Sequence, residues 1–473
     1  MTKRHKLKLL ILVSSILSTQ LLATNGYFSH GYGGKEKGMA GAGVAKGGSS
    51  ITTANNPANL FQVGERMDIG LAIFDPVRSY SVSGEPTLPS GFSPVIGSPA
   101  LNCTPPLSQA TCQIPFSSNT GTVESGREWF AIPSFGYSTK IDDDLIFGLA
   151  LYGNGGMNTQ YSGGSARFLD PDSNTIVDAP GTFGAGTTGV DLAQLFINNT
   201  LAYQANEKVA LGVSLIVAVQ TFEATGLNAF TNNSLEPTKL TNNGHDMSYG
   251  YGFKLGVNFS LRDNFSIGVS YQSEMNMTEF DDYAGLYAQQ GDFDIPSTYT
   301  IGFAWDTSNT STLLLDYQTI NYSDIPAIAN SISPLLNPVS CTDALNNFLI
   351  SGSQAATGNG CLGGSHGAGF GWNDVSVIKL GYEWTDGDSS YRFGYSTIDQ
   401  PISSTEVNFN LLAPGVVEEH FTIGYTNNSG EKEWTIFLMY APEVEIIGTS
   451  NFDPSQTISF KMHQFEFGLE YRL

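Results

Sequence analysis

The 473-residue chain has few charged residues, and basic ones are scarcest. Only 14% of its residues are charged, against about 25% in an ordinary soluble domain, so its surface is not built mainly for water. It has 21 basic and 44 acidic residues. Because phosphate binding needs clustered lysine and arginine, this balance argues against a nucleic-acid partner. Hydrophobic residues make up 41% of the chain, which is too much apolar side chain for a disordered protein.

Long apolar runs are also missing, apart from a short one near the N-terminus. Four lysine and arginine residues precede an apolar run over 9–17, and Ala23 is a small residue suited to cleavage. This three-part pattern predicts an export signal over residues 1–23. As a membrane anchor the run falls short of the roughly 20 residues that a spanning helix needs. The signal carries four basic residues and no acidic one, so its removal changes the net charge from −23 to −27. Export without an anchor leaves a secreted protein, a periplasmic protein or a β-barrel of the outer membrane.

Cysteine is scarce too. The four cysteines fall into two close pairs, each inside one Gly/Pro/Ser-rich stretch: Cys103 with Cys112, and Cys341 with Cys361. Four cysteines allow three pairings, and we expect two local disulfides within loops. No C-x-x-C and no histidine at zinc-finger spacing occurs, so the sequence predicts no metal site.

Motifs for catalysis and cofactors are weak. No H-E-x-x-H, P-loop or intact G-x-G-x-x-G is present, and we expect no cofactor. The stretch 363–367 fits G-x-S-x-G, but that motif needs a strand-to-helix elbow in an α/β sheet. An outer-membrane lipase using a serine with His420 or His463, both near strand ends, is the alternative that remains, and we do not expect an enzyme.

Alternation of apolar and polar residues predicts fourteen strands. They run near Met67–Val82, Glu128–Thr139, Leu145–Tyr161, Leu192–Tyr203, Val209–Ala224, Met247–Leu261, Phe265–Phe280, Pro296–Trp305, Thr312–Tyr322, Val375–Trp384, Ser390–Ile398, Glu418–Thr426, Glu433–Ala441 and His463–Leu473. Tight polar turns join them at 142–144, 205–208, 262–264, 306–309, 385–388 and 427–430. Between these turns lie long connections at 83–127, 162–191, 225–246, 281–295, 323–374, 399–417 and 442–462.

Short and long connections between strands therefore alternate along the chain. This pattern is typical of a bacterial outer-membrane barrel, which has short periplasmic turns and long extracellular loops. A soluble sandwich has no reason for such an asymmetry, and a β-helix would show a fixed repeat. In the last strand the residues from Phe465 to Leu473 alternate between apolar side chains on one face and polar or small ones on the other. We predict an all-β, 14-stranded antiparallel transmembrane barrel over 66–473, with lipid outside and a polar lumen.

Residues 24–65 do not alternate and are rich in glycine, alanine, serine and asparagine. A segment of this length before the first strand is either a periplasmic tail or lies inside the lumen. Its small residues, with scattered apolar ones such as Met39 and Leu60, favour close packing in a confined bore.

The run from Asn25 to Phe61 resembles the FadL/TodX family of outer-membrane transporters for hydrophobic compounds. The resemblance rests on GMAGAGVA and on the triplet Asn56-Pro57-Ala58 just before the first strand, and extends more weakly over nearly the whole mature chain. It implies a fourteen-stranded barrel in the outer membrane, plugged by an N-terminal hatch. We accordingly expect a hydrophobic small molecule as substrate and a monomer surrounded by outer-membrane lipid.

The third strand carries Gly153, Asn154, Gly155 and Gly156 in its middle. Glycine inside a strand weakens pairing and marks bulges or bends. In the family that the chain resembles, a kink in this strand opens a window through the wall, which implies a lateral opening here. Backbone left unpaired at membrane depth must be covered by protein, and the hatch could cover it. The alternative is a glycine-rich bend at the barrel rim.

A fatty-acid channel should offer an apolar pocket and a cation for the carboxylate. Alternation places three cations in the lumen: Lys254, Lys379 and Arg392. Together with Phe28 of the hatch they are our candidate substrate-binding residues. The other interpretation is that these cations pair with acidic residues of the lumen, which would be Asp316, Glu383 and Glu466.

The carboxylate-binding basic residues of the family have no clear counterpart here. At those places the chain has Gln220, Phe222, Glu223 and Asp324. This departure leaves room for neutral compounds such as hydrocarbons, taken up passively. The alternative function is an adhesion or receptor barrel whose long loops bind a host or a phage.

Overall fold

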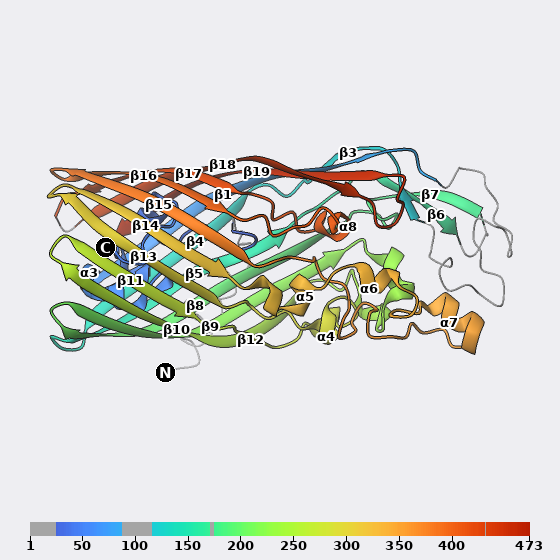
Figure 1. Ribbon diagram of the computed structural model, residues 1–473, viewed down its shortest axis with the longest axis horizontal. Coiled ribbons are helices and arrows are strands. Elements are labelled where there is room, and N and C mark those ends of the chain that lie inside the picture. The colour runs from blue at the N-terminus through green and yellow to red at the C-terminus, as the bar shows by residue number, and fades with distance from the viewer. Residues whose placement is uncertain (1–24, 88–115, 171–174, 431) are drawn as a thin grey trace, which may run out of the picture.

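The structure is a computed structural model that describes residues 25–87, 116–170, 175–430 and 432–473 (Figure 1). The predicted export signal lies outside these residues, and so do Cys103 and Cys112. No helix in the described part is long and apolar enough to cross a membrane.

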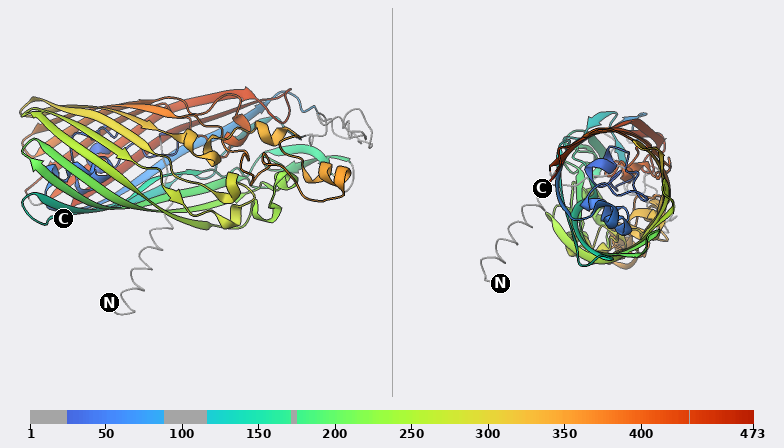
Figure 2. Two further views of the ribbon diagram at one scale, coloured as in Figure 1. Left: turned by 60° about the horizontal axis from the view of Figure 1, so that its bottom comes forward. Right: turned by 90° about the vertical axis from the view of Figure 1, so that its left-hand side faces the viewer.

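Fourteen antiparallel strands form the wall of a barrel (Figures 1 and 2). They are β1 (Arg66–Ser83), β4 (Phe130–Lys140), β5 (Leu145–Asn158), β8 (Gly189–Asn206), β9 (Val209–Thr225), β10 (Asp246–Arg262), β11 (Phe265–Gln272), β13 (Thr298–Ser308), β14 (Ser311–Ile320), β15 (Val375–Asp386), β16 (Ser389–Ile398), β17 (Glu419–Asn428), β18 (Glu433–Thr449) and β19 (Thr457–Arg472). Each pairs with the next, and β19 pairs with β1 to close the ring, from Asp68 opposite Arg472 to Ser83 opposite Thr457. The predicted fold class is confirmed.

The remaining elements lie mostly at the long-loop end. They include the strands β2 (Phe116–Ser118), β3 (Gly121–Glu124), β6 (Ser165–Asp170), β7 (Thr175–Pro180) and β12 (Asn276–Met277), and the short helices α4 (Ala288–Gly291), α5 (Pro326–Ala329), α6 (Ser333–Leu336), α7 (Ala344–Ser351) and α8 (Val407–Asn410). β2, β6 and β7 form a small separate sheet, whereas β3 and β12 extend the barrel sheet along β1 and β10. Cys341 and Cys361 are joined by a disulfide in the loop that carries α7.

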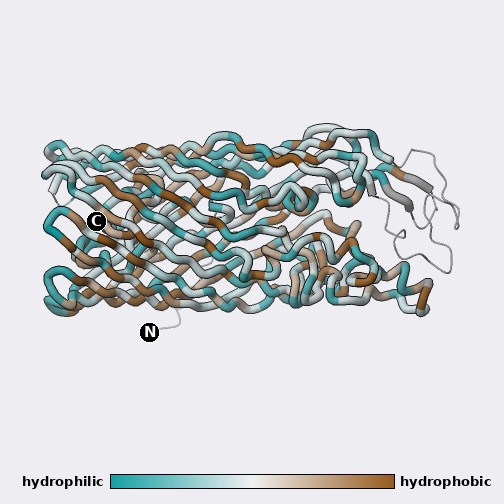
Figure 3. Tube along the Cα trace, viewed as in Figure 1, coloured by the Kyte–Doolittle hydropathy of each residue, from teal (hydrophilic) through white to brown (hydrophobic). Residues whose placement is uncertain are grey.

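Hydrophobic and hydrophilic residues alternate along the strands (Figure 3), and the exposed fractions show that the apolar side chains face outward. In β19, Phe465, Phe467 and Leu469 are each about half exposed, whereas Gln464 and Glu466 are buried. This is the arrangement that a wall between lipid and a polar lumen requires. The predicted direction of the alternation is confirmed.

Three predicted strand boundaries are wrong at the long-loop end. β18 continues to Thr449 and β19 begins at Thr457, so the predicted long connection at 442–462 is only 450–456. Pro442 lacks a backbone donor, and the strand passes it by a shift of register between Ala441 and Val444. The strict alternation of short and long connections therefore fails at its last position. The seventh strand is also shorter than predicted, since β11 ends at Gln272 and β12 follows separately.

Residues 25–65 lie inside the ring of strands (Figure 2, right). They form α2 (Gly34–Lys37), η1 (Ser50–Ala54), η2 (Pro57–Asn59) and α3 (Leu60–Val63), and most of them are buried. Glycines on the inner wall permit this close packing. A Cβ atom at Gly256 would lie 2.0 Å from Asn56 Oδ1, and one at Gly268 would lie 2.0 Å from Val44 O. Any larger residue at these wall positions would push the segment out of place.

The triplet Asn56-Pro57-Ala58 begins η2 and fastens it to the wall. The Asn56 side chain accepts a hydrogen bond from Ala58 N at 3.0 Å and donates to Val44 O at 2.7 Å and to Val257 O at 3.0 Å. Asparagine suits this N-cap position because its short side chain can both accept and donate. One side chain thus joins two parts of the segment to β10.

Candidate functional site

The cations of the lumen contact residues 25–65 or acidic residues of the wall. Lys254 Nζ donates to Ala54 O, and Lys379 Nζ donates to His30 O at 3.1 Å. Arg392 lies 2.5 Å from Glu383 and donates to Thr426 Oγ1 at 2.6 Å. A buried charge needs such partners because transfer out of water is otherwise strongly unfavourable. Each cation thus has a structural role, and its role in substrate binding stays a prediction.

Three of the four candidate substrate-binding residues lie together. Phe28, Lys254 and Lys379 line one polar cavity of about 20 Å³, which Asp316 also borders. The carboxylate of Asp316 accepts hydrogen bonds from Gly43 N and Val44 N. Arg392 lies outside this cavity.

A network of ion pairs and hydrogen bonds attaches residues 25–65 to the barrel wall near its periplasmic end. Asp68 accepts hydrogen bonds from Ser50 N at 2.8 Å and Ser50 Oγ at 2.5 Å, and also from Arg66. Arg66 and Lys35 each lie 2.8 Å from Glu433. η1 and α2 are therefore tied to β1 and β18 through buried charges.

The pairing between β4 and β5 stops part-way up the wall. It runs from Lys140 opposite Ile146 to Phe135 opposite Leu151 and does not continue further within the described chain. β5 remains paired with β8 as far as Asn158, with a shift of register between Gly153 and Gly155. The predicted interruption thus coincides with a bulge in β5 and with a gap between β4 and β5.

Residues 27–29 take the place of β4 at this gap. Phe28 forms an isolated bridge with Gly155, Gly156 N donates to Tyr27 O at 3.0 Å, and Ser29 N donates to Asn154 O at 2.8 Å. Backbone groups that β4 would have satisfied are thereby paired from inside. We call residues 25–29 the strap, because they cover the gap from the lumen side.

The gap is closed again at its extracellular end. Gly126 N donates to Gln160 O at 2.8 Å, and Gln160 N donates to Ser125 Oγ at 3.0 Å. Arg78 reaches from β1 and donates to the carbonyls of both Asn158 and Arg127. The gap in strand pairing, which we call the window, is therefore bounded, with strand pairing below it and these contacts above it.

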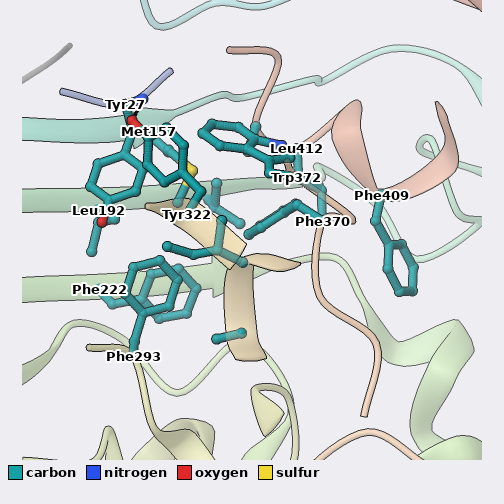
Figure 4. Packing of buried hydrophobic residues seen from close by; sticks show 14 of the residues in the cluster. Tyr27, Met157, Leu192, Phe222, Phe293, Tyr322, Phe370, Trp372, Phe409 and Leu412 are labelled. Carbon is teal, nitrogen blue, oxygen red and sulfur yellow. Dashed lines mark hydrogen bonds between the residues drawn. The ribbon is translucent and has the colours of Figure 1, made fainter. Parts of the chain in front are cut away.

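Above the strap lies a chamber packed with aromatic side chains from the loops (Figure 4). Tyr322 is its centre, with its ring centroid 5.4 Å from that of Tyr27 and 5.2 Å from that of Trp372. Next to these rings is a cavity of about 30 Å³ lined by Val190, Leu227, Phe230, Leu286, Tyr287, Ala327, Leu362, Ala368, Gly369, Phe370, Phe409 and Leu412. None of these lining residues is charged. Ligand pockets measure roughly 300–1,000 Å³, so a substrate must displace side chains to enter.

A row of side-chain hydrogen bonds leads from the window to the loops. Tyr32 donates to Asn154 at 2.7 Å, Asn154 donates to Gln194 at 2.9 Å, and Gln194 donates to Gln220 at 3.1 Å. Gln220 in turn donates to Phe293 O at 2.8 Å. Gln220, which occupies a place where the family resemblance implies a cation, is thus fully engaged with neutral partners.

The sequence did not predict the aromatic chamber, apart from Phe28. Tyr322, Phe293 and Trp372 come from connections between strands, where no period marks which side chains turn inward. The density of aromatic residues in those connections was the only signal available.

Charged side chains gather above the window, at the extracellular ends of β8 and β9. His245 Nε2 lies 3.0 Å from Asp191 Oδ2, and His245 Nδ1 lies 3.6 Å from Glu223 Oε2. Their ligand atoms lie within 4.8 Å of one another, which is close enough for a shared cation. Arg127 already contacts the Asp191 carboxylate. The hydrogen bond to Asp191 raises the pKa of His245 above its usual value.

The ion pairs of His245 should make the order of the 226–245 loop depend on pH. Because the pKa is raised by folding, their contribution is fully present below about pH 6.5, the ordinary value, and is lost as the pH rises through the raised pKa. Amide hydrogen exchange in 226–245 should therefore be slower at pH 6 than at pH 8.5 after correction for intrinsic rates. His245→Gln should remove the difference, and equal protection at both pH values in the unaltered protein would contradict the prediction.

A comparison with known protein families identifies the family of this chain. The outer membrane protein transport protein family (OMPP1/FadL/TodX) matches residues 17–334. The chain belongs to this family. It is therefore an outer-membrane transport protein, and the OMPP1/FadL/TodX family is one of transport channels rather than enzymes.

Solved structures of the OMPP1/FadL/TodX kind share the fold at low sequence identity. The toluene transporter TodX of Pseudomonas putida has a TM-score of 0.60 at 15% identity, covering 94% of this chain and 98% of its own. The Ralstonia pickettii toluene transporter TbuX gives 0.55 at 16%, covering 94% and 98%. A Pseudomonas aeruginosa FadL homologue gives 0.58 at 13%, covering 96% and 99%. No curated protein matches the sequence.

Proposed function

We propose that the protein is a passive channel that admits neutral hydrophobic molecules from outside and releases them sideways into the membrane through the window at Gly153–Gly156. The observation that carries the proposal is the uncharged lining of the cavity above the strap. The names of TodX and TbuX, both toluene transporters, agree with a substrate of this kind.

The route follows from the chemistry of such a substrate. A hydrophobic molecule gains free energy in proportion to the apolar surface that it takes out of water, so a water-filled pore through the hatch would be a barrier. The chamber leads down to the strap, which is held to β5 by hydrogen bonds at Asn154 and Gly156. Displacing Tyr27 and Phe28 would connect the chamber to lipid without moving the rest of residues 25–65.

A fatty acid is the second candidate, because Lys254 and Lys379 share a polar cavity with Phe28. To bind there, a carboxylate would have to replace the carbonyl of Ala54 on Lys254 and lie near the carboxylate of Asp316. Both requirements oppose binding, since a buried anion needs an unopposed cation. Neutral molecules meet neither obstacle.

Uptake of radiolabelled toluene and oleate by cells with and without the protein tests the proposal. We expect toluene uptake to depend on the protein and to be unchanged in Lys254→Met with Lys379→Met. Protein-dependent uptake of oleate alone, lost in that double variant, would favour the fatty-acid candidate. Absence of protein-dependent uptake for both probes would refute transport and favour the adhesion or receptor alternative.

A further inference from the structure

Among the described residues, Tyr287 is the one polar side chain at the wall of an otherwise apolar cavity. It lies just before α4, in the loop between β12 and β13. Its ring packs at 4.8 Å, between centroids, from both Phe222 and Phe293, and the residue is 3% exposed. Of the residues that line the cavity, it alone has a side chain with a hydrogen-bonding atom.

The hydroxyl of Tyr287 is buried and has no hydrogen-bond partner within the described residues. Buried tyrosine hydroxyls normally find one. The hydroxyls of Tyr27, Tyr152 and Tyr161 also lack a partner among the described residues, but none of these three residues lines the cavity. Two other tyrosines near Tyr287 are paired. Tyr283 donates to Gly244 O at 2.6 Å, and Tyr322 donates to Asn25 O at 2.5 Å. Burial raises the pKa of Tyr287 well above its ordinary value, so the hydroxyl keeps its proton and can donate a hydrogen bond.

Phenylalanine would fill the same space without a buried donor left unpaired. The rings of Phe222, Phe280 and Phe293 around Tyr287 already supply the apolar packing. A hydroxyl here thus weakens the fold unless something that enters the cavity pairs with it. The cavity of about 30 Å³ that Tyr287 lines has room for one small polar group. Because the hydroxyl oxygen itself is buried, the Tyr287 side chain must shift to bring the two into contact.

We propose that the Tyr287 hydroxyl binds the oxygen of a neutral, mono-oxygenated hydrophobic substrate, such as a phenol, and selects it over the parent hydrocarbon. The inference rests on the proposed function and names its substrate class. Discrimination follows the rule that a site built to hydrogen-bond a substrate rejects the analogue that lacks the bonding group. The uncharged walls exclude an ionised head group, so the oxygen must belong to a neutral molecule.

Uptake of p-cresol and p-xylene tests the inference, because the two molecules differ only by a hydroxyl in place of a methyl group. In Tyr287→Phe we expect the half-saturating concentration for p-cresol to rise about tenfold, the worth of one hydrogen bond. Uptake of p-xylene should change by less than about twofold. Tyr283→Phe is the matched control: it removes a neighbouring hydroxyl that does not border the cavity, and should leave the ratio of the two substrates unchanged.

The outcomes separate this inference from the function on which it rests. An unchanged ratio of p-cresol to p-xylene in a Tyr287→Phe protein with normal heat-modifiable gel mobility would overturn the role of Tyr287 and leave transport standing. An equal change for both substrates would mean that the hydroxyl holds only a resident water, which also overturns the inference. Failure of the unaltered protein to take up either molecule would overturn the proposed function itself.

Discussion

Replacing Gly155 by valine and Gly156 by threonine should stop uptake while the barrel still inserts. β-Branched residues favour regular strand pairing, and their side chains would fill the window that the strap now covers. Gly155 bridges Phe28, and Gly156 N donates to Tyr27 O, so the substitutions act at the place where strap and wall meet. We expect the rate to fall more than about tenfold, for which about 1.4 kcal/mol of added barrier suffices. Radiolabelled toluene uptake measures it.

The matched control changes the same strand below the window. Leu149→Val with Leu151→Thr places two β-branched residues where β5 pairs regularly with both β4 and β8, and uptake should stay near the original rate. Heat-modifiable gel mobility should be normal in both proteins. Full uptake by the correctly folded Gly155→Val, Gly156→Thr protein would mean that substrate leaves by another path, and the lateral exit would have to be abandoned.

Replacing Asp68 by alanine should release the hatch and open a wide aqueous pore. The change removes the acceptor of Ser50 N and Ser50 Oγ and leaves Arg66 with Glu433 alone. Removing one partner from a buried pair typically weakens a fold by 3–5 kcal/mol, and here the loss falls on the contact between η1 and β1. We expect conductance in planar bilayers to rise several-fold and cells to become sensitive to vancomycin.

Asp142→Ala is the control for charge and for position near the periplasmic turns. Asp142 is exposed and, among the residues that the structure describes, its side chain accepts a hydrogen bond only from Asp144 N within its own turn. Conductance and vancomycin resistance should not change. If the Asp68→Ala protein also keeps its original conductance, the segment is held without this ion pair, and the contacts of Asn56 with Val44 and Val257 would be its main attachment.

The strands were predictable because every strand residue faces either lipid or lumen, and the two environments demand opposite chemistry. The exceptions have local causes. Pro442 interrupts the hydrogen bonding of β18 without ending the strand, and a proline in a sequence is more often a boundary. Beyond Gln272 the alternation continues, although the chain has left the ladder for the short strand β12.

The hydrogen-bond partners of the lumen side chains could not be predicted from the sequence. Lys254 and Lys379 lie where alternation places them, but their acceptors are carbonyls of Ala54 and His30, and any residue type supplies a carbonyl. The same holds for the gap beside Gly153–Gly156. Glycines in a strand indicate that its pairing is interrupted. Which backbone segment pairs with the strand at that point is seen only in the three-dimensional structure.

The contacts of residues 25–65 also impose an order on assembly. Gly34 N donates to Glu470 across 436 positions of sequence, and Lys37 contacts Glu466 across 429. Contacts so distant form late, because the intervening chain must first lose its conformational freedom. Residues 25–65, which are rich in small residues, therefore remain unpaired during folding until β19 has joined the barrel. The composition of this segment is poor in long apolar and β-branched side chains, which protects it from aggregation while it is unpaired.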